Sequence, residues 1–285
     1  MRSLARDRYL IVYTDLDGTL LDAETYAYEA ARPALEALRR HRALLVLCSS
    51  KTRAEMEPLV NELGLRAPFI VENGGAIYLP REDFAAWVSE AQWCGPWGRI
   101  VLGAPRARVL ACLSDLKRRL AVPVVGWSDL TPEEIAGECG LSLEAARRAM
   151  RREFDEPFRI GSEDSAVLSR LAAIVDEHGL HLTRGGRYFH LMGASDKGRA
   201  VRVLADIMRR RFGAIFTVGI GDSGNDVPML AAVDLPILVR RPSGEPDPDA
   251  VRLIPRACVT LGIGPVGWNE AVLEILAERE GRWDS

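Results

Sequence analysis

Short apolar segments that end in polar, glycine-containing loops recur through the first 75 residues. Residues 9–13, 43–47 and 69–71 each have the unbroken apolar character of a strand that is buried on both faces. Helical patterns lie between them: one covers residues 29–40, and a T-x-x-E capping box at Thr52 predicts the start of the next. This alternation predicts an α/β fold with a doubly wound, mostly parallel, Rossmann-like sheet whose loops gather at one edge.

The pattern changes in the middle of the chain. Residues 80–98 show no regular apolar period and are expected to form a loop. Helix patterns follow at residues 106–120, 132–138, 143–151 and 164–178, with short strand candidates at residues 122–127, 157–160, 180–184 and 188–192. We therefore expect an inserted α+β cap domain at residues 87–191, between the two parts of the sheet domain at residues 1–86 and 192–285.

The rhythm of strands and helices then returns. Helices are predicted at residues 196–211, 225–232 and 270–280, and strands at residues 214–220 and 235–239. The proline-rich stretch at residues 241–249 predicts a loop. These elements complete the predicted sheet domain.

Length and composition exclude several classes of protein. The chain has 285 residues, 48% hydrophobic and 27% charged, which is enough for two domains. A formal net charge of -3 gives no basic surface for nucleic acid. No apolar run approaches the roughly 20 residues that cross a membrane, and no signal peptide is evident. Five cysteines without a C-x-x-C pair predict no zinc site or disulfides and fit a reducing cytoplasm. We expect a monomer or a weak homodimer.

Acidic residues gather at the ends of two predicted strands. Asp15 and Asp17 follow the first strand, and their side chains would point the same way if that strand continued. Gly18 permits a sharp turn after them, and Asp222 and Asp226 follow a later strand. Clustered carboxylates repel one another unless a proton or cation lies between them, and their oxygens suit Mg2+. The alternative for the first pair is an Asx turn that happens to contain two aspartates.

Lysine is scarce in this chain. Of 37 basic residues, only Lys51, Lys117 and Lys197 are lysines. Lys117 belongs to a charged helix face and is expected to be solvated, whereas Lys197 begins a helical pattern. Where arginine is so strongly favoured, a retained lysine indicates a need for a compact point charge.

Taken together, these motifs resemble the haloacid dehalogenase superfamily of phosphatases. The resemblance is carried by D-x-D-G-T at residues 15–19, a serine after the second strand, Lys197, and G-D-x-x-N-D at residues 221–226. The strings at residues 48–53, 71–75, 184–190 and 264–268 are similar to a narrower family, the mannosyl-3-phosphoglycerate phosphatases. The superfamily's second motif usually has Gly and Arg after its Ser or Thr. Here Ser49 precedes Ser50 and Lys51, so either serine is a candidate for the phosphoryl contact.

The resemblance implies a role for each core residue. Asp15 is expected to be the nucleophile that forms an aspartyl-phosphate, and Asp17 the general acid and base. Ser49 is expected to bond the phosphoryl group, and Lys197 to offset negative charge. The expected Mg2+ ligands are Asp15, Asp17, Asp222 and Asp226, the last direct or indirect. The expected substrate-binding residues are Ser50, Lys51, Asn73, Gly74, Gly186, Arg187, His190 and Asn225.

The predicted cap carries its own candidates in the string R-G-G-R-Y-F-H at residues 184–190. Its two glycines allow close backbone approach to a ligand, Arg187 can grip a carboxylate or phosphate, and His190 can bond sugar hydroxyls. The alternative is a hairpin turn with a solvated arginine and a half-buried histidine. Other cap arginines, at 147, 148, 151, 152 and 159, are expected to form a mostly solvated face from which one reaches the substrate.

The implied function is Mg2+-dependent hydrolysis of mannosyl-3-phosphoglycerate, a small anionic sugar ester, to the compatible solute mannosylglycerate and phosphate. The glucosyl analogue or another small sugar phosphate is the alternative, and a phosphomutase is a weaker one. A phosphate-accepting receiver protein would share the acids and the lysine. Receivers are much shorter, however, and the second acid, Asp17, suits turnover better than storage of a phosphoryl group.

Overall fold

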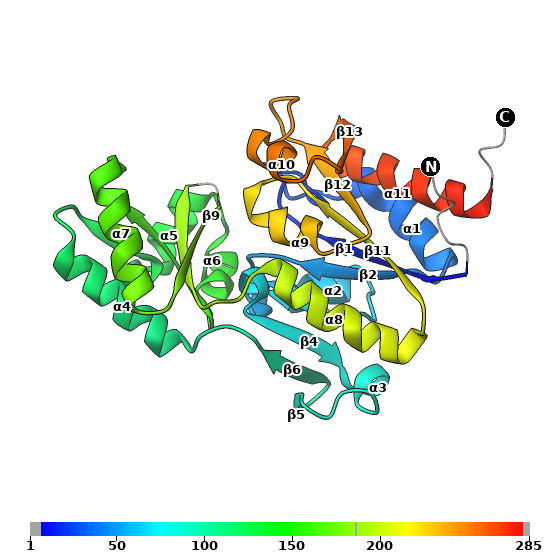
Figure 1. Cartoon of the computed structure of the whole chain (residues 1–285), viewed down its shortest axis with the longest axis horizontal. Helices are drawn as coiled ribbons and strands as arrows, with labels where there is room; N and C mark the ends of the chain where they lie inside the picture. The colour runs from blue at the N-terminus through cyan, green and yellow to red at the C-terminus, as the bar shows by residue number, and fades with distance from the viewer. Residues whose placement is uncertain (1–6, 186, 282–285) are drawn as a thin grey trace.

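The computed structural model describes residues 7–185 and 187–281, and within them the main feature is a nine-stranded sheet (Figure 1). Its strands, in sheet order, are β13 (Cys258–Ile263), β12 (Leu235–Arg240), β11 (Ile215–Gly221), β1 (Tyr9–Thr14), β2 (Leu44–Cys48), β3 (Phe69–Val71), β4 (Ala76–Pro80), β6 (Trp97–Val101) and β5 (Gln92–Cys94). The pairs from β13 to β3 are parallel, and those from β3 to β5 are antiparallel. The predicted mostly parallel α/β fold is therefore confirmed.

Helices cover both faces of this sheet. One face packs against α1 (Arg32–Arg40), α2 (Arg53–Glu62) and α11 (Gly264–Glu280). The other packs against α3 (Arg81–Phe84), α8 (Lys197–Phe212), α9 (Val227–Ala231) and α10 (Pro248–Leu253). Alternate residues of β1 face the two cores, Leu10 and Val12 one and Ile11 and Tyr13 the other. Burial on both faces explains the continuous apolar runs of the central strands.

A second sheet lies to one side of the first in Figure 1. In the described part of the chain it has four antiparallel strands, in the order β7 (Val124–Gly126), β8 (Asp155–Ile160), β10 (Tyr188–Met192) and β9 (His181–Gly185). A core formed with α4 (Arg106–Arg119) and α7 (Ser165–Glu177) supports it. A smaller cluster joins α5 (Pro132–Cys139) and α6 (Leu143–Ala149) to Trp127. We call this sheet and its helices the cap.

Several local predictions were wrong. Residues 80–98, expected to be a loop, contain α3, β5 and the start of β6, and these strands extend the large sheet beyond residue 87. The strands are short and interrupted by glycine, so they leave no clear period of two. α10 overlaps the expected loop at residues 241–249, and no strand was predicted at β4 or β13. α11 begins at Gly264 and not at residue 270, because Pro265 suits its first turn.

We propose that the chain divides into a sheet domain and a cap. The strand pairing favours passage of the chain between these two parts near residues 102–104 and 193–195. The two crossings lie against each other: a Cβ atom on Gly193 would clash with the backbone of Ala104. Among the described residues, no helix is long and apolar enough to cross a membrane.

Candidate active site

The ends of β1 and β11 meet at one edge of the large sheet. The backbone N–H of Asp15 donates to the carbonyl of Ile220 at 2.9 Å, which holds the two strand ends in register. Gly18 has a φ of +78°, and a Cβ atom there would lie 3.0 Å from a carboxylate oxygen of Asp222. Glycine at this turn therefore brings the D-x-D loop close to the acids after β11.

A buried lysine joins two of these acids. Lys197 is only 1% exposed, and its Nζ lies 2.6 Å from Asp15 Oδ1 and 2.6 Å from Asp226 Oδ1. The side chain of Asp196 accepts the N–H of Arg199 at 2.6 Å and caps α8, which fixes the lysine in the first turn. Burial disfavours the charge on Lys197, but the two carboxylates outweigh burial and raise its pKa.

Three carboxylates, those of Asp15, Asp222 and Asp226, each place an oxygen within 4.8 Å of the others. Burial, followed by the charge of Asp226, raises the pKa of Asp15 to about 7 despite Lys197. Burial and the charges of Asp226 and Asp15 raise the pKa of Asp222 to about 8. Crowded carboxylates of this kind are relieved by a cation, and an all-oxygen donor set fits a hard divalent ion such as Mg2+.

Asp226 is already committed within the cluster. Its Oδ1 pairs with Lys197, and its Oδ2 accepts the backbone N–H groups of Asp222 at 3.1 Å and Ser223 at 3.2 Å. Both oxygens thus have protein partners, which favours a role in orienting the site over direct metal binding. Asp15 and Asp222 are the better candidates for ligands.

Asp17 does not join this cluster, although it was expected to share the metal. β1 ends at Thr14, so the period of two does not carry on to residue 17. Instead, Asp17 Oδ2 pairs with Lys51 Nζ at 2.8 Å, and the Lys51 ammonium lies 5.0 Å from the ring centre of Tyr26. The Asp17 side chain is 40% exposed. Its other oxygen, Oδ1, is buried without a partner among the described residues, and Asp17 lines the cleft described below, so the expected acid–base role fits this position better than the metal role.

The loops after β2 and β3 are tightly packed. Ser49 is 1% exposed and its Oγ accepts the N–H of Lys51 at 3.2 Å, whereas Ser50 lines the cleft described below. Asn73 has a φ of +54°, donates its N–H to the carbonyl of Ser49 at 3.0 Å, and has a buried amide without a partner among the described residues. A Cβ atom on Gly74 would clash with the carbonyl of Asp196. These contacts bring the loops together beside Lys197.

A cleft of about 460 Å³ lies between the sheet edge and the cap. The expected residues that line it are Asp15, Asp17, Ser50, Lys51, Arg187, His190, Asp222 and Asn225. Arg187 is exposed, and Ser223 Oγ donates to Asn225 Oδ1 at 2.7 Å. Gly186 falls outside the described residues. The structure thus brings residues from both sheets to one cavity.

His190 is more buried than a turn residue would be. It is 7% exposed, and its Nδ1 lies 2.9 Å from Asp155 Oδ2. Asp155 also pairs with Arg152, and this guanidinium, together with His190, keeps the pKa of Asp155 below its usual range despite burial. The histidine ring is therefore held in place by a buried acid, with Nε2 as the nitrogen that can meet a ligand.

Among the further residues that line the cleft are Tyr26, Trp127, Arg152 and Arg241, none of which sequence reasoning named as a site residue. Arg152 was assigned to a mostly solvated face but is only 7% exposed. Its guanidinium lies 5.1 Å from the ring centre of Trp127 and donates to the carbonyl of Ser50 at 3.2 Å. A single arginine within a run of arginines gives no sequence signal that it will be buried, because Ser50 and Trp127, which Arg152 contacts, are distant in the chain.

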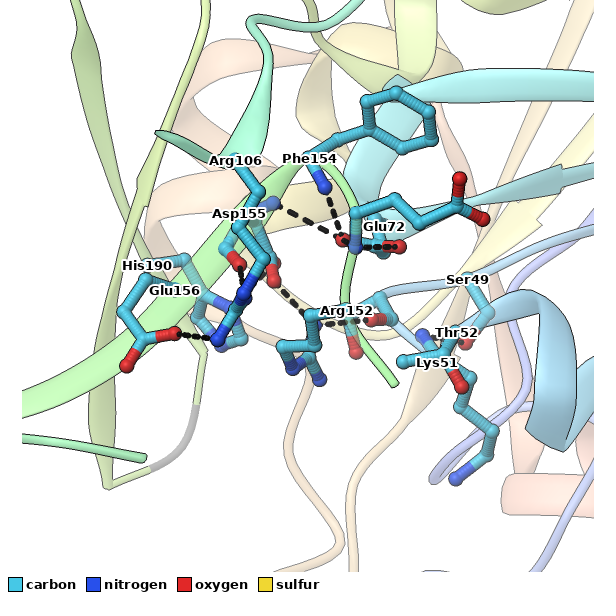
Figure 2. Close-up of polar contacts among 12 residues, drawn as sticks. Ser49, Lys51, Thr52, Glu72, Arg106, Arg152, Phe154, Asp155, Glu156 and His190 are labelled. Carbon is cyan, nitrogen blue, oxygen red and sulfur yellow. Dashed lines mark hydrogen bonds and ion pairs between the residues drawn. The ribbon is translucent and has the colours of Figure 1, made fainter. Parts of the chain in front are cut away.

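Glu72 fastens the cap to the large sheet beside this arginine (Figure 2). Its buried Oε2 accepts three consecutive backbone N–H groups, those of Glu153 at 3.1 Å, Phe154 at 2.7 Å and Asp155 at 3.0 Å. Thr52 Oγ1 adds a bond to the carbonyl of Arg148 at 2.9 Å. The segment that carries Arg152 is thus held directly against the loops after β2 and β3.

Comparison with known proteins agrees with this geometry. A family model for haloacid dehalogenase-like hydrolases matches residues 12–87. The chain is 42% identical to the glucosyl-3-phosphoglycerate/mannosyl-3-phosphoglycerate phosphatase of Methanococcoides burtonii, over 94% of this chain and 97% of that protein. It is 37% identical to the protein of the same name from Persephonella marina, over 95% and 98% of the two chains.

Solved structures share the fold at lower identity. A Bacteroides thetaiotaomicron phosphatase of the haloalkanoate superfamily has a TM-score of 0.64 and 20% identity, over 95% of this chain and 96% of that one. The sucrose-phosphatase of Synechocystis, solved with sucrose and phosphate, has a TM-score of 0.61 and 17% identity, over 94% and 98%. These matches include both the large sheet and the cap.

Proposed function

The chain belongs to the haloacid dehalogenase-like hydrolases and is a phosphoric monoester hydrolase, and from that premise we propose that it converts mannosyl-3-phosphoglycerate to mannosylglycerate and phosphate in a Mg2+-dependent reaction. Such a reaction would complete the synthesis of mannosylglycerate. The glucosyl analogue is the second candidate substrate, because the relatives from Methanococcoides burtonii and Persephonella marina are named for both sugars.

The arrangement of Asp15, Lys197 and Asp17 carries this proposal. Asp15 attacks the phosphorus through one carboxylate oxygen while the bond from phosphorus to the terminal oxygen of the sugar-bearing glycerate breaks, which leaves an aspartyl-phosphate. Asp17, exposed to the cleft and paired with Lys51, gives a proton to that departing oxygen. It then takes a proton from the water that attacks the aspartyl-phosphate, so that phosphate leaves and Asp15 is restored.

The remaining groups of the site would support charge and position. Lys197, 2.6 Å from Asp15, favours the ionised form of the nucleophile against the effect of burial and would offset the negative charge of the phosphoryl group. Mg2+, held by Asp15 and Asp222 with Asp226 orienting them, would supply the further positive charge that a phosphate ester requires. Ser49 or Ser50 would bond a phosphoryl oxygen from the loop after β2.

The cap would select the substrate. A bare phosphate does not distinguish one monoester from another, whereas a sugar-linked phosphoglycerate adds a carboxylate and several hydroxyl groups. Arg187 and His190 line the cleft away from the acid cluster, where they could contact those groups. Asn225 and Lys51 line the same cleft from the loops of the large sheet.

The experiment that tests the proposal is a phosphate-release screen with purified protein and Mg2+. The panel contains mannosyl-3-phosphoglycerate, glucosyl-3-phosphoglycerate, sucrose 6-phosphate, glucose 6-phosphate and p-nitrophenyl phosphate. We expect the highest kcat/KM with the mannosyl ester and the next highest with the glucosyl ester. A preference for an ester without glycerate would contradict the proposed substrate but not the phosphatase activity.

A further inference from the structure

Three buried hydrogen-bond donors on residues that line the cleft have no partner among the residues that the structure describes. They are Nε of Arg152, Nε of Arg241 and the indole Nε1 of Trp127. Of these side chains, Arg152 and Trp127 are the most buried, at 7% and 8% exposed, and the two are in contact with each other. Buried donors without an acceptor are costly and rare in folded proteins. Their position at a cavity wall therefore points to an acceptor that a ligand supplies.

The position of Arg152 limits which part of a ligand it can reach. One of its terminal nitrogens donates to the carbonyl of Ser50 at 3.2 Å, and Ser50 belongs to the loop that we place against the phosphoryl group. The same nitrogen also donates to Asp155, which is itself bonded to His190 at 2.9 Å. The unpaired Nε belongs to the same guanidinium and therefore lies close to the phosphoryl-binding loop.

The chemistry of the wall favours an anionic acceptor. The unpaired atoms of Arg152 and Trp127 are donors and call for oxygen lone pairs, whereas the unpaired acceptor among the described residues of the lining, Asp17 Oδ1, belongs to the proposed acid–base residue. The basic residues that line the cleft are Lys51, Arg152, Arg187 and Arg241. The nearest acids are already engaged: Glu72 accepts three backbone N–H groups, and Asp155 pairs with Arg152 and His190. A ligand carboxylate would meet both donors with charge-assisted bonds.

We propose that Arg152 and Trp127 bind the carboxylate of the substrate's glycerate unit and thereby determine specificity. This rests on the proposed function, in which glycerate links the phosphate to the sugar. A three-carbon unit that is phosphorylated at one end carries its carboxylate at the other, so the carboxylate must lie close to the phosphoryl-binding loop. The sugar, on the middle carbon, then extends toward the exposed Arg187.

The test compares two small esters that differ in a single group. 3-Phosphoglycerate and glycerol 3-phosphate have the same phosphate and carbon chain, but only the first has a carboxylate. The ratio of their kcat/KM values isolates recognition of that group and cancels changes in the chemical step or in the amount of folded enzyme. Where turnover of either ester is slow, the inhibition constants of both esters against p-nitrophenyl phosphate hydrolysis give the corresponding ratio of affinities.

Two variants remove one donor each. Arg152→Lys keeps the charge but removes the Nε–H, and Trp127→Phe keeps an aromatic ring but removes the indole N–H. The matched control is Arg159→Lys, because Arg159 is a cap arginine that pairs with Glu138 at 2.7 Å and lies outside the cleft lining. Should Arg152→Lys fail to fold, as judged by circular dichroism, Trp127→Phe decides the matter alone.

We expect the wild type to prefer 3-phosphoglycerate, and both variants to lose about tenfold or more of that preference while the control keeps it. A wild type that does not distinguish the two esters would overturn the proposal, and so would folded variants that retain the full preference. Failure of the proposed function would look different: neither sugar-phosphoglycerate would be hydrolysed faster than 3-phosphoglycerate. The ratio for the two sugar-free esters does not depend on that result.

Discussion

Replacing Glu72 by alanine tests whether one carboxylate holds the cap against the large sheet. The oxygen Oε2 alone accepts three backbone N–H groups, from Glu153, Phe154 and Asp155, at 2.7–3.1 Å. Glu72→Ala removes that acceptor and leaves all three buried donors without a partner. Glu72→Gln, in contrast, can put its carbonyl oxygen in the position of Oε2 and retain the bonds from Phe154 and Asp155, while its amide nitrogen replaces Oε1, which also accepts the Glu153 N–H at 3.0 Å.

The expected magnitudes follow from these contacts. An unpaired buried N–H costs roughly 1–3 kcal/mol, and water entering the vacated space would relieve part of the total. We therefore expect Glu72→Ala to lower the free energy of unfolding by about 3–5 kcal/mol, a fall in Tm on the order of 10 °C. The charge itself contributes little, because burial and the nearby Asp155 raise the pKa of Glu72 to about 7. For Glu72→Gln we expect a loss of about 1 kcal/mol or less.

Hydrogen exchange of the amides at residues 153–155 is the direct measurement. We expect it to accelerate more than tenfold in Glu72→Ala and, at residues 154 and 155, to stay close to wild type in Glu72→Gln. Glu153→Gln is the control, because its carboxylate pairs with Arg99 at the surface and should contribute less than about 1 kcal/mol. If Glu72→Ala behaves like this control, or if glutamine is as damaging as alanine, the three bonds do not anchor the cap.

Three further predictions concern pH, metal and specificity. Between about pH 5 and pH 8, urea unfolding should show the wild type losing stability relative to Glu72→Gln as the pH rises. Because the pKa of Glu72 is raised in the folded protein, the folded state keeps a proton that the unfolded chain has released, so the wild type is most stable at the acid end of this range. A constant difference would contradict this. Exhaustive EDTA treatment should abolish phosphate release and Mg2+ should restore it, whereas full activity without metal would remove the role of the acid cluster. Arg187→Ala should lower kcat/KM for mannosyl-3-phosphoglycerate about ten- to a hundredfold relative to p-nitrophenyl phosphate; equal losses would place Arg187 in the fold or the chemistry.

The core of the site could be predicted because topology determines it. Parallel strands end at a common sheet edge, so the acids after β1 and β11 had to meet there, and a helix cap had to place Lys197 nearby. Local patterns were enough to predict β1, β11 and α8, which carry these residues, and the order of the strands brings them together. The position of Asp17 was harder to predict, because β1 ends at Thr14 and the Asp17 side chain pairs with Lys51.

The cap contacts could not be predicted from local patterns. Glu72 and Glu153 are 81 positions apart, and no local pattern in either segment predicts that the Glu72 carboxylate accepts backbone N–H groups from residues 153–155. Arg152 likewise looks like its neighbours in a basic run, yet the bonds to Ser50 and Asp155 bury it. Contacts between distant segments depend on how the two sheets pack, and a hydrophobic period carries no information about that.

The central claim is that Asp15 carries the phosphoryl group during turnover. The most direct measurement is an acid quench of wild type and Asp15→Asn during reaction with p-nitrophenyl phosphate and Mg2+, followed by peptide mass spectrometry. Asparagine is nearly isosteric but a poor nucleophile. The account predicts a base-labile phosphoryl group on the wild-type peptide that contains Asp15, and neither adduct nor turnover in the variant. A phosphoryl group on another residue, or an active Asp15→Asn enzyme, would contradict it.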